Sequence, residues 1–429
     1  MSVSQCVTYA SGQGVSDNTT RYLPITGYLF ANSVIDYPEI PVRDAGSFSN
    51  LYTYAHTNTT GVTSVLTLLK SQVATALTVS YTSGQTGIKE DTSNSVAFAN
   101  TDEVEYSVAV PTEAGTTTIT LSVMAVNFTP DTSTNTISFL ITQGASTDAS
   151  ASTTKFQSPE GILASPSTTT EANTKLRIRA SVVFSDLYTY VSSNSRTTNT
   201  SYGTRKNGAA GSQIVTYTSG QTGVKEDASN TDSLVATDDY NYYITTSTGT
   251  ENIILRVIST TGINTAGFFI MESSNSEGTG VGFGSTNYIG TSGRLQLTAT
   301  EANAQTLARF TYVASELASY VSANTSNGTT DIHIRDNGGN SSVTVQYTTT
   351  QTGLKNDTSN TTTITSGTDE INYGIVDGGS SGTVTFMWVS CMGKAAGTSI
   401  KTKKGLVYAS VKTFKGLVTA SVKTDKGLA

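Results

Sequence analysis

The sequence predicts an all-β protein made of three tandem two-sheet β-sandwiches, followed by a short C-terminal β-repeat tail. An eleven-residue motif occurs three times, runs of alternating apolar and polar residues lie between turn-forming residues, and helical patterns of any length are missing. A chain of 429 residues also has room for about three domains of ~150 residues each.

The repeated motif fixes the length of a module. It reads Tyr-Thr-Ser-Gly-Gln-Thr-Gly-Ile-Lys-Glu-Asp from Tyr81, and related copies begin at Tyr217 and Tyr347. A second landmark, Leu-Tyr-Thr-Tyr in the first two copies and Leu-Ala-Ser-Tyr in the third, precedes the motif by the same distance in each copy. The two landmarks therefore belong to one rigid unit that the chain uses three times.

Strands are predicted where residues alternate with period two. Leu187, Thr189 and Val191 fall on one face of such a run, whereas Tyr188 and Tyr190 fall on the other. The corresponding runs in the other copies alternate in the same way, so each module should contain about eight short strands in two sheets.

Asn-Gly pairs predict tight hairpin turns in two of the copies. Asn207-Gly208 and Asn337-Gly338 occupy equivalent positions, and both residue types tolerate positive φ. The first copy has Ser71-Gln72 there, so we expect its turn to differ.

Small-residue segments suggest the module boundaries. Residues 144–154 and 273–286 have the composition of short linkers, so the modules should form a rod or a stack. The expected divisions are an N-terminal segment at residues 1–38 that includes part of the first strands of module 1 and is a candidate anchor, modules 1 to 3 at residues 39–143, 155–272 and 286–394, and a tail at residues 395–429.

Charge divides the chain into an acidic body and a basic tail. Residues 400–429 carry seven lysines and one acid, a net charge of +6, while the whole chain has −7, so residues 1–399 carry −13. An acidic body argues against a nucleic-acid-binding surface on the modules. The tail repeats every 11 residues, and three such short strands are too few to fold alone. We expect it to anchor the protein to another subunit or protein through Lys401, Lys412, Lys423, Leu406, Leu417 and Leu428.

Composition favours a virion or other extracellular protein. Only 13% of residues are charged, and Thr, Ser, Gly and Asn are abundant. Residues 1–9 lack the pattern of a Sec export signal, and no apolar run is long enough to span a membrane. We expect a protein that is made in the cytoplasm and released by lysis, as virion parts are, and that makes no membrane contact.

Catalytic and metal-binding residues are not expected. His56 and His333 lie at non-equivalent places in different modules, and Cys6 and Cys391 lie at opposite ends of the chain. The sequence thus predicts no enzyme, no catalytic residue and no cofactor.

One repeated loop leaves a calcium site open as an alternative to a turn. Its Asp and Asn side chains supply oxygen ligands for Ca²⁺ in one interpretation, and satisfy their own backbone as an Asx turn in the other. One carboxylate per loop favours the turn. The residues concerned are Asp91, Asn94, Asp227, Asn230, Asp357 and Asn360.

Tyrosines on the second strand face are predicted to form a subunit interface. Tyr54, Tyr190 and Tyr320 occupy one position in three copies, opposite the Leu and Val residues that should fill the core. Because one apolar face per strand suffices for a core, a second face with aromatic residues suggests contact with another subunit. The alternative is a half-exposed Tyr of ordinary sheet propensity.

Module 2 carries a resemblance to a known family on Glu171-Ala-Asn173, Leu187 to Asn194, Arg205-Lys-Asn-Gly208, Gln221 to Asn230 and Asp238 to Tyr242. This pattern resembles the C1q/TNF-like jelly-roll modules of phage and prophage structural proteins, and it covers most of residues 20–394. The first copy departs from it at Ile35 and at the Asn-Gly turn. The resemblance implies three tandem jelly-roll β-sandwiches that trimerise about an axis along the sandwich.

A role on the outside of a virion follows from this resemblance. It implies a trimeric capsid decoration protein or head fibre whose partners are copies of itself and capsid or tail proteins. The tail is similar to short Val-Lys-Thr-x-x-Gly-Leu endings of phage-associated proteins. The alternatives are a tail fibre or receptor-binding protein that contacts host surface glycans, and a bacterial cell-surface adhesin or filament subunit.

Overall fold

The computed structural model describes residues 3–395 except residues 114, 116, 132–134, 149–151, 164–167 and 250. Beyond residue 395 it describes two short paired strands, β31 (Thr402–Lys403) and β32 (Leu406–Val407). The described chain contains six five-stranded sheets, two in each of three sandwiches, and the predicted all-β fold is confirmed. No helix among the described residues is long and apolar enough to cross a membrane.

Module 1 has the strand order of a jelly roll. One sheet runs β3-β1-β10-β5-β8 and the other runs β2-β9-β6-β7, with β4 also paired to β9. The strands are β1 (Ser4–Ser16), β2 (Thr19–Leu23), β3 (Gly27–Tyr28), β4 (Ile40–Pro41), β5 (Gly46–Asn58), β6 (Ser64–Lys70), β7 (Val73–Tyr81), β8 (Gly87–Phe98), β9 (Glu103–Val110) and β10 (Thr118–Pro130).

Modules 2 and 3 repeat this order and add a short 3-10 helix each. Module 2 consists of β11 (Thr136–Asp148), β12 (Thr154–Gln157), β13 (Gly161–Leu163), η1 (Glu171–Thr174), β14 (Leu176–Arg177), β15 (Val182–Asn194), β16 (Thr200–Lys206), β17 (Ala209–Tyr217), β18 (Gly223–Leu234), β19 (Asp239–Thr246) and β20 (Ile253–Asn264). Module 3 consists of β21 (Phe268–Gly282), β22 (Thr286–Ile289), β23 (Gly293–Arg294), η2 (Glu301–Asn303), β24 (Thr306–Leu307), β25 (Tyr312–Asn324), β26 (Thr330–Asp336), β27 (Gly339–Tyr347), β28 (Gly353–Ile364), β29 (Glu370–Asp377) and β30 (Thr383–Ala395).

The structure places both module boundaries earlier than the sequence suggested. The small-residue segments that we expected to be linkers overlap the long first strands β11 and β21, which pair with β20 and β30. Both strands shift register within these segments, after Gln143 and after Ser274. Small residues therefore mark β-bulges here, where the ladder admits extra residues, and do not mark linkers. Module 2 begins with Thr136, module 3 begins with Phe268, and β1 to β3 of module 1 lie within residues 1–38.

The turn of the first copy does not differ from the other two. Ser71 and Gln72 have φ of 45° and 66°, close to 52° and 79° for Asn207 and Gly208. Ser71 Oγ also accepts a hydrogen bond from the backbone of Glu103, as the side chain of Asn207 does from Asp239. The surrounding sheet thus holds a Ser-Gln pair in a conformation that usually requires Asn and Gly.

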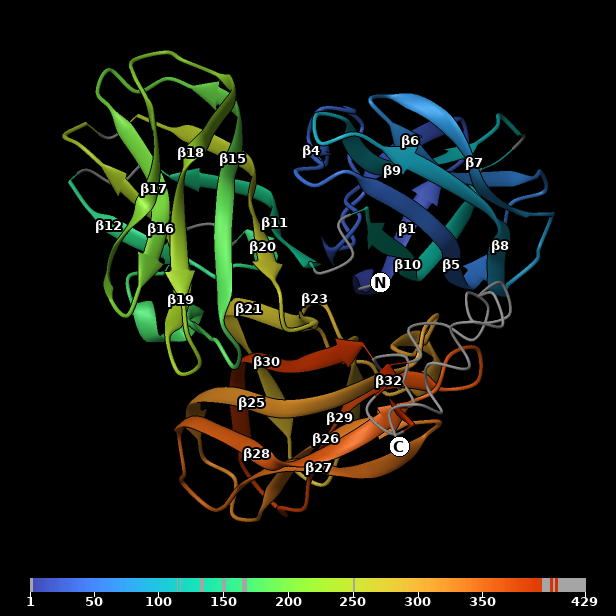
Figure 1. Ribbon diagram of the computed structural model, residues 1–429, viewed down its shortest axis with the longest axis vertical. Coiled ribbons are helices and arrows are strands. Elements are labelled where there is room, and N and C mark those ends of the chain that lie inside the picture. Colours follow the sequence, from blue (N-terminus) through green and yellow to red (C-terminus); the bar gives the residue numbers. More distant parts are fainter. Residues whose placement is uncertain are drawn as a thin grey trace.

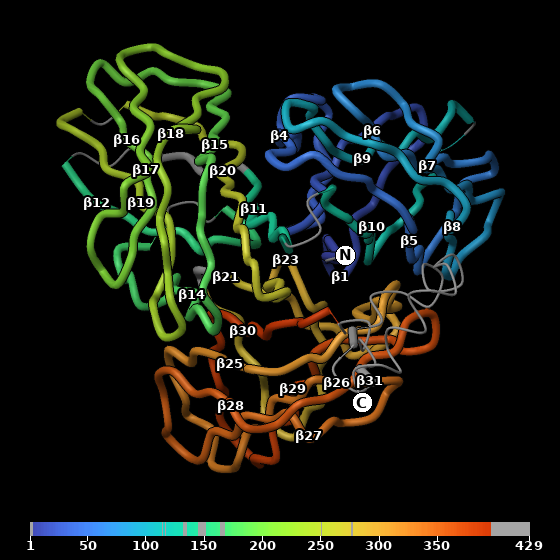
Figure 2. The backbone as a smooth tube through the Cα atoms, viewed as in Figure 1, coloured from blue at the N-terminus to red at the C-terminus, as the bar shows by residue number. Residues whose placement is uncertain are grey.

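The modules form a closed ring and not the expected rod or stack. Figures 1 and 2 show three lobes, coloured blue, green and orange, around a common centre. Strand β3 of module 1 lies against β11 of module 2, β13 lies against β21 of module 3, and β23 lies against β1 of module 1. Each module therefore makes the same kind of contact with the next, and the third contact closes the ring.

Glycine permits the close approach of the modules at this centre. Gly27, Gly161 and Gly293 open β3, β13 and β23, and their φ values are 84°, 110° and 103°. A Cβ atom on Gly27 would lie 2.4 Å from the carbonyl oxygen of Ile141 in module 2, and one on Gly293 would lie 2.3 Å from the carbonyl oxygen of Gly27. A larger residue would push the modules apart.

Gly27→Ala should therefore destabilise the protein more than Gly87→Ala. Gly87 has nearly the same φ of 89°, but its Cβ would meet no atom of the described residues within 4 Å. We expect ~1–2 kcal/mol of backbone strain in both variants. Gly27→Ala should cost a further ~1–3 kcal/mol from overpacking between modules. Urea unfolding of the two variants measures this difference, and equal losses of stability would contradict the close contact.

Candidate functional site

Equivalent residues of the three modules meet at the centre of the ring. Thr26, Glu160 and Ser292 each precede the glycine that opens β3, β13 or β23. Thr26 Oγ1 lies 2.7 Å from Glu160 Oε1 and 3.0 Å from Ser292 Oγ, and the Ser292 hydroxyl also donates to Glu160. These contacts among equivalent residues define a pseudo-three-fold axis within one chain.

Two buried carboxyl groups lie at this centre, on Glu160 and on Glu272 of β21. Burial raises the pKa of Glu160 to about 8, although the hydroxyls of Ser292 and Thr26 oppose the shift. Burial, reinforced by the charge of Glu160, raises the pKa of Glu272 well above its usual value. Both groups are therefore largely protonated at neutral pH, which avoids two like charges in a buried site.

Arginine side chains connect each module to an acid of the next. Arg43 of module 1 pairs with Glu226 of module 2, and Arg309 of module 3 lies 2.6 Å from Glu90 of module 1. The equivalent residue of module 2 is Arg179. Burial lowers the pKa of Arg179, and the negative charge of Glu316 in module 3 opposes this shift. The ring therefore repeats one electrostatic contact between modules, with a different acid at the third position.

Two of the predicted interface tyrosines lie at contacts between modules of one chain, and the third packs within its own module. Tyr54 packs against the apolar core cluster that module 3 shares with module 1, and the ring of Tyr190 lies 5.4 Å from that of Tyr37 in module 1. Tyr320 stacks on Trp388 within module 3, with ring centroids 6.4 Å apart. The second aromatic face of each strand thus has a partner without another subunit.

The repeated motif forms a structural turn. In module 1 the Tyr81 hydroxyl donates to the carbonyl oxygen of Gly87 at 2.9 Å, and Asn58 Nδ2 donates to the carbonyls of Thr82 and Gln85. Modules 2 and 3 contain the same hydrogen bonds. The motif recurs because it closes the end of each sandwich.

The predicted calcium residues form hydrogen-bonded bulges. Asp91 Oδ1 accepts hydrogen bonds from Ser93 and Asn94, and Oδ2 accepts from Asn94 Nδ2 at 2.8 Å and from the backbone of Thr78 at 3.2 Å. Asp227 with Asn230 and Asp357 with Asn360 repeat this arrangement. Each aspartate already accepts hydrogen bonds at both oxygens and joins β8, β18 or β28 to the opposite sheet, which favours the turn.

Catalytic groups do not come together in the described part of the chain. His56 Nδ1 lies 2.8 Å from Ser122 Oγ, but Ser122 is fully buried and no carboxylate partners His56 among the described residues. His333 lies in β26 of module 3, where burial lowers its pKa. Both cysteines are buried and unpaired, and no three His, Cys, Asp or Glu side chains within the described ranges are arranged to hold a metal ion.

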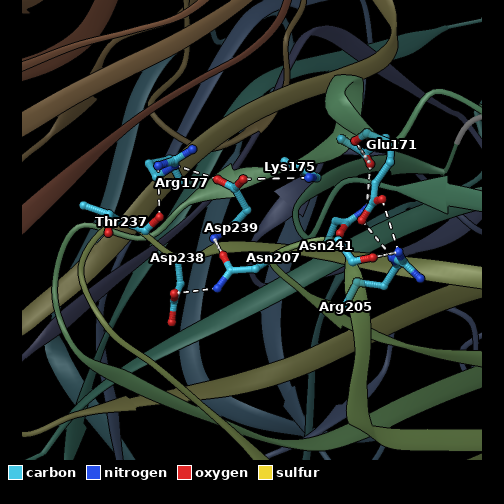
Figure 3. Close-up of polar contacts among 11 residues, drawn as sticks. Glu171, Lys175, Arg177, Arg205, Asn207, Thr237, Asp238, Asp239 and Asn241 are labelled. Carbon is cyan, nitrogen blue, oxygen red and sulfur yellow. Dashed lines mark hydrogen bonds and ion pairs between the residues drawn. The ribbon is translucent and has the colours of Figure 1, made fainter.

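The modules differ in charge beside β9, β19 and β29. Figure 3 shows this region of module 2, where Asp239 lies 2.6 Å from Arg177 and 3.8 Å from Lys175. Asn241 donates to Thr174 at 2.9 Å. Asp239 of this module thus has two basic partners.

Module 1 has acids where module 2 has Lys175, Asp239 and Asn241, and Pro41 where it has Arg177. These acids are Glu39, Glu103 and Glu105 respectively, and Asp36 stands where module 2 has Ala172. We call Asp36, Glu39, Glu103 and Glu105 the acid cluster. Sequence reasoning missed it, although alignment of the three copies through β4, β14 and β24 would have revealed it.

The expected anchoring residues lie almost entirely outside the described residues. This holds for Lys401, Lys412, Lys423, Leu417 and Leu428, whereas the backbone of Leu406 belongs to β32 and pairs with Lys403.

Acid titration should reveal the contribution of the hydrogen-bonded aspartates. Burial alone would raise the pKa of Asp357, but the hydrogen bonds from Asn360 and Thr344 lower it to about 2. A carboxyl with a lowered folded-state pKa adds stability above its unfolded value of about 3.9, and this contribution is lost as pH falls through about 2.

Asp357→Asn should therefore lower the free energy of unfolding by about 1.5–3 kcal/mol at pH 7, because charge-assisted hydrogen bonds are lost. The difference in the free energy of unfolding between the variant and the native protein should shrink between pH 4 and pH 2, because protonation of Asp357 removes the same charge-assisted hydrogen bonds from the native protein. Urea titrations across this range measure it, and a deficit independent of pH would contradict the assignment.

Comparison with known proteins identifies no family. No family model and no curated protein matches the sequence. Two solved structures align over 89% of this chain at 11% identity. One is described as the triple jelly roll fold and turret assembly of an archaeal virus. The alignment includes 91% of that chain, with a TM-score of 0.18. The other, from Sulfolobus Turreted Icosahedral Virus, is covered to 92% with a TM-score of 0.17. At such TM-scores we take nothing about function from either.

Proposed function

We propose that this chain is a structural protein of a virus particle, a decoration protein or fibre on its outer surface. The closed ring of three jelly rolls is the observation that carries the proposal. Apolar core residues continue across its contacts, as where Ile137, Phe139 and Ile141 of module 2 join the core of module 1. Such a ring is a rigid building block, because its modules cannot separate without exposing core residues.

The polar clusters of the ring favour a structural role over an enzymatic one. The repeated motif, the hydrogen-bonded aspartates and the centre of the ring all use their polar groups to hold strands or modules together. The acidic body and the basic tail provide the means of attachment, since a +6 segment suits an acidic face on another virion protein.

We further propose that one chain, and not a homotrimer, is the three-lobed unit. The tyrosine faces that suggested contact with another subunit have partners within the chain. The protein should therefore have a solution mass near 44.9 kDa by light scattering. A stable species of three times this mass would restore the homotrimer expected from the sequence.

Charge reversal in the tail tests the attachment. Substituting Lys401, Lys412 and Lys423 with Glu should reduce the amount of protein on purified particles at least tenfold, measured by quantitative immunoblotting. Lys89, Lys225 and Lys355 occupy equivalent positions in the three modules, so their substitution with Glu changes net charge equally and should leave occupancy unchanged. Loss in both variants, or in neither, would contradict attachment through the tail. Absence of the native protein from particles would contradict the virion role itself.

A further inference from the structure

The acid cluster of module 1 contains a buried carboxylate without a partner. Glu105 lies in β9 between the core residues Val104 and Tyr106, so its side chain points to the opposite face of the sheet. It is fully buried there, and neither of its carboxylate oxygens has a hydrogen-bond partner in the part of the chain that the structure describes. Such a group is costly in a folded protein unless it is protonated or a cation joins it.

The other members of the cluster surround Glu105 with further negative charge. Burial, followed by the charges of Glu39, Asp36 and Glu103, raises the pKa of Glu105 to about 10. Glu39 is only 3% exposed, and burial raises its pKa to about 7 even though Gln72 donates a hydrogen bond to it. No basic side chain is among the groups that act on either carboxyl.

The equivalent region of module 2 contains basic side chains as well as an acid. There Arg177 and Lys175 approach the Asp239 carboxylate from opposite sides, and Asn241 replaces the buried Glu (Figure 3). Module 3 also has an Asn, Asn372, at the position of Glu105, together with the uncharged Gln305 in place of Glu39. Module 1 alone combines four acids here, and no basic side chain among the described residues is a cause of the shifts at its two buried carboxyls.

We propose that Asp36, Glu39, Glu103 and Glu105 form a divalent cation site that binds Ca²⁺ at the boundary between modules 1 and 2. Ca²⁺ accepts six to eight oxygen ligands in flexible geometry, which suits carboxylates from two segments. Gln72 Nε2 donates to both Asp36 and Glu39, which places these two carboxylates together. The acids are not arranged to hold an ion in this conformation, so binding requires their side chains to move toward one another. Tyr188 of module 2 belongs to the core cluster of module 1, and burial, followed by the charges of Glu103 and Glu39, raises the pKa of its hydroxyl. The cluster therefore lies beside the contact between these modules, and a bound ion stabilises that contact.

Calcium-dependent stability of the full chain tests this site. After dialysis against EDTA, added CaCl₂ should raise the thermal midpoint of the native protein, and titration calorimetry should detect one ion per chain. Glu105→Asn installs the residue that modules 2 and 3 already carry, so the variant should fold and its calcium affinity should fall at least tenfold. A native protein whose midpoint does not respond to calcium would overturn the proposal and leave protonated acids as the explanation.

Two further variants separate this site from other effects. Glu39→Lys copies module 2, so it should abolish the calcium response and make the EDTA-treated protein more stable than the native chain under the same conditions. Asp227→Asn removes a hydrogen-bonded aspartate of module 2 and should leave the calcium-dependent shift unchanged. If Asp227→Asn abolishes the shift and Glu105→Asn does not, the ion binds at the repeated bulges instead, which overturns the assignment to the acid cluster.

Discussion

Backbone contact at the centre of the ring is the constraint on which the rest of the structure depends. Three glycines let β3, β13 and β23 approach a neighbouring module closely, and the residues before them hydrogen-bond to one another. Burial of two carboxyl groups there is tolerated because both remain protonated. Once the centre is closed, the outer faces of the modules meet, and Arg43 and Arg309 reach acids of the adjoining modules.

Local features of the fold could be predicted from the sequence, and the arrangement of modules could not. Alternation around Leu187 located a strand, and the repeats gave the number of sandwiches, because both depend on nearby residues. The bulges in β11 and β21 have the composition of linkers, so the boundaries were misplaced. The ring depends on contacts such as that of Thr26 with Glu160. These two residues are 134 positions apart, and no periodic pattern in the sequence indicates that they meet.

The same distinction applies to the candidate sites: a site made of residues close in sequence could be predicted, and one made of distant segments could not. The repeated Asp-x-Ser-Asn loop was visible because it recurs, and its alternative as an Asx turn could be stated because the donors are close in sequence. The acid cluster occurs in one copy only and combines residues from two segments, so repetition concealed it. Residues that the copies share stabilise the module, and residues that they do not share distinguish one module from another.

Fusion of three modules into one polypeptide also removes a restriction that symmetry imposes on an oligomer. In a homotrimer, any residue on the three-fold axis is present three times, and three copies of Glu160 would bring three carboxyl groups together without a hydroxyl to solvate them. In this chain a single Glu meets Thr26 and Ser292, and its Oε1 accepts hydrogen bonds from both. Because one gene encodes all three modules, the residue that each module places at the axis can change independently of the other two. A feature that occurs once in the chain, such as the tail, is then present once per ring.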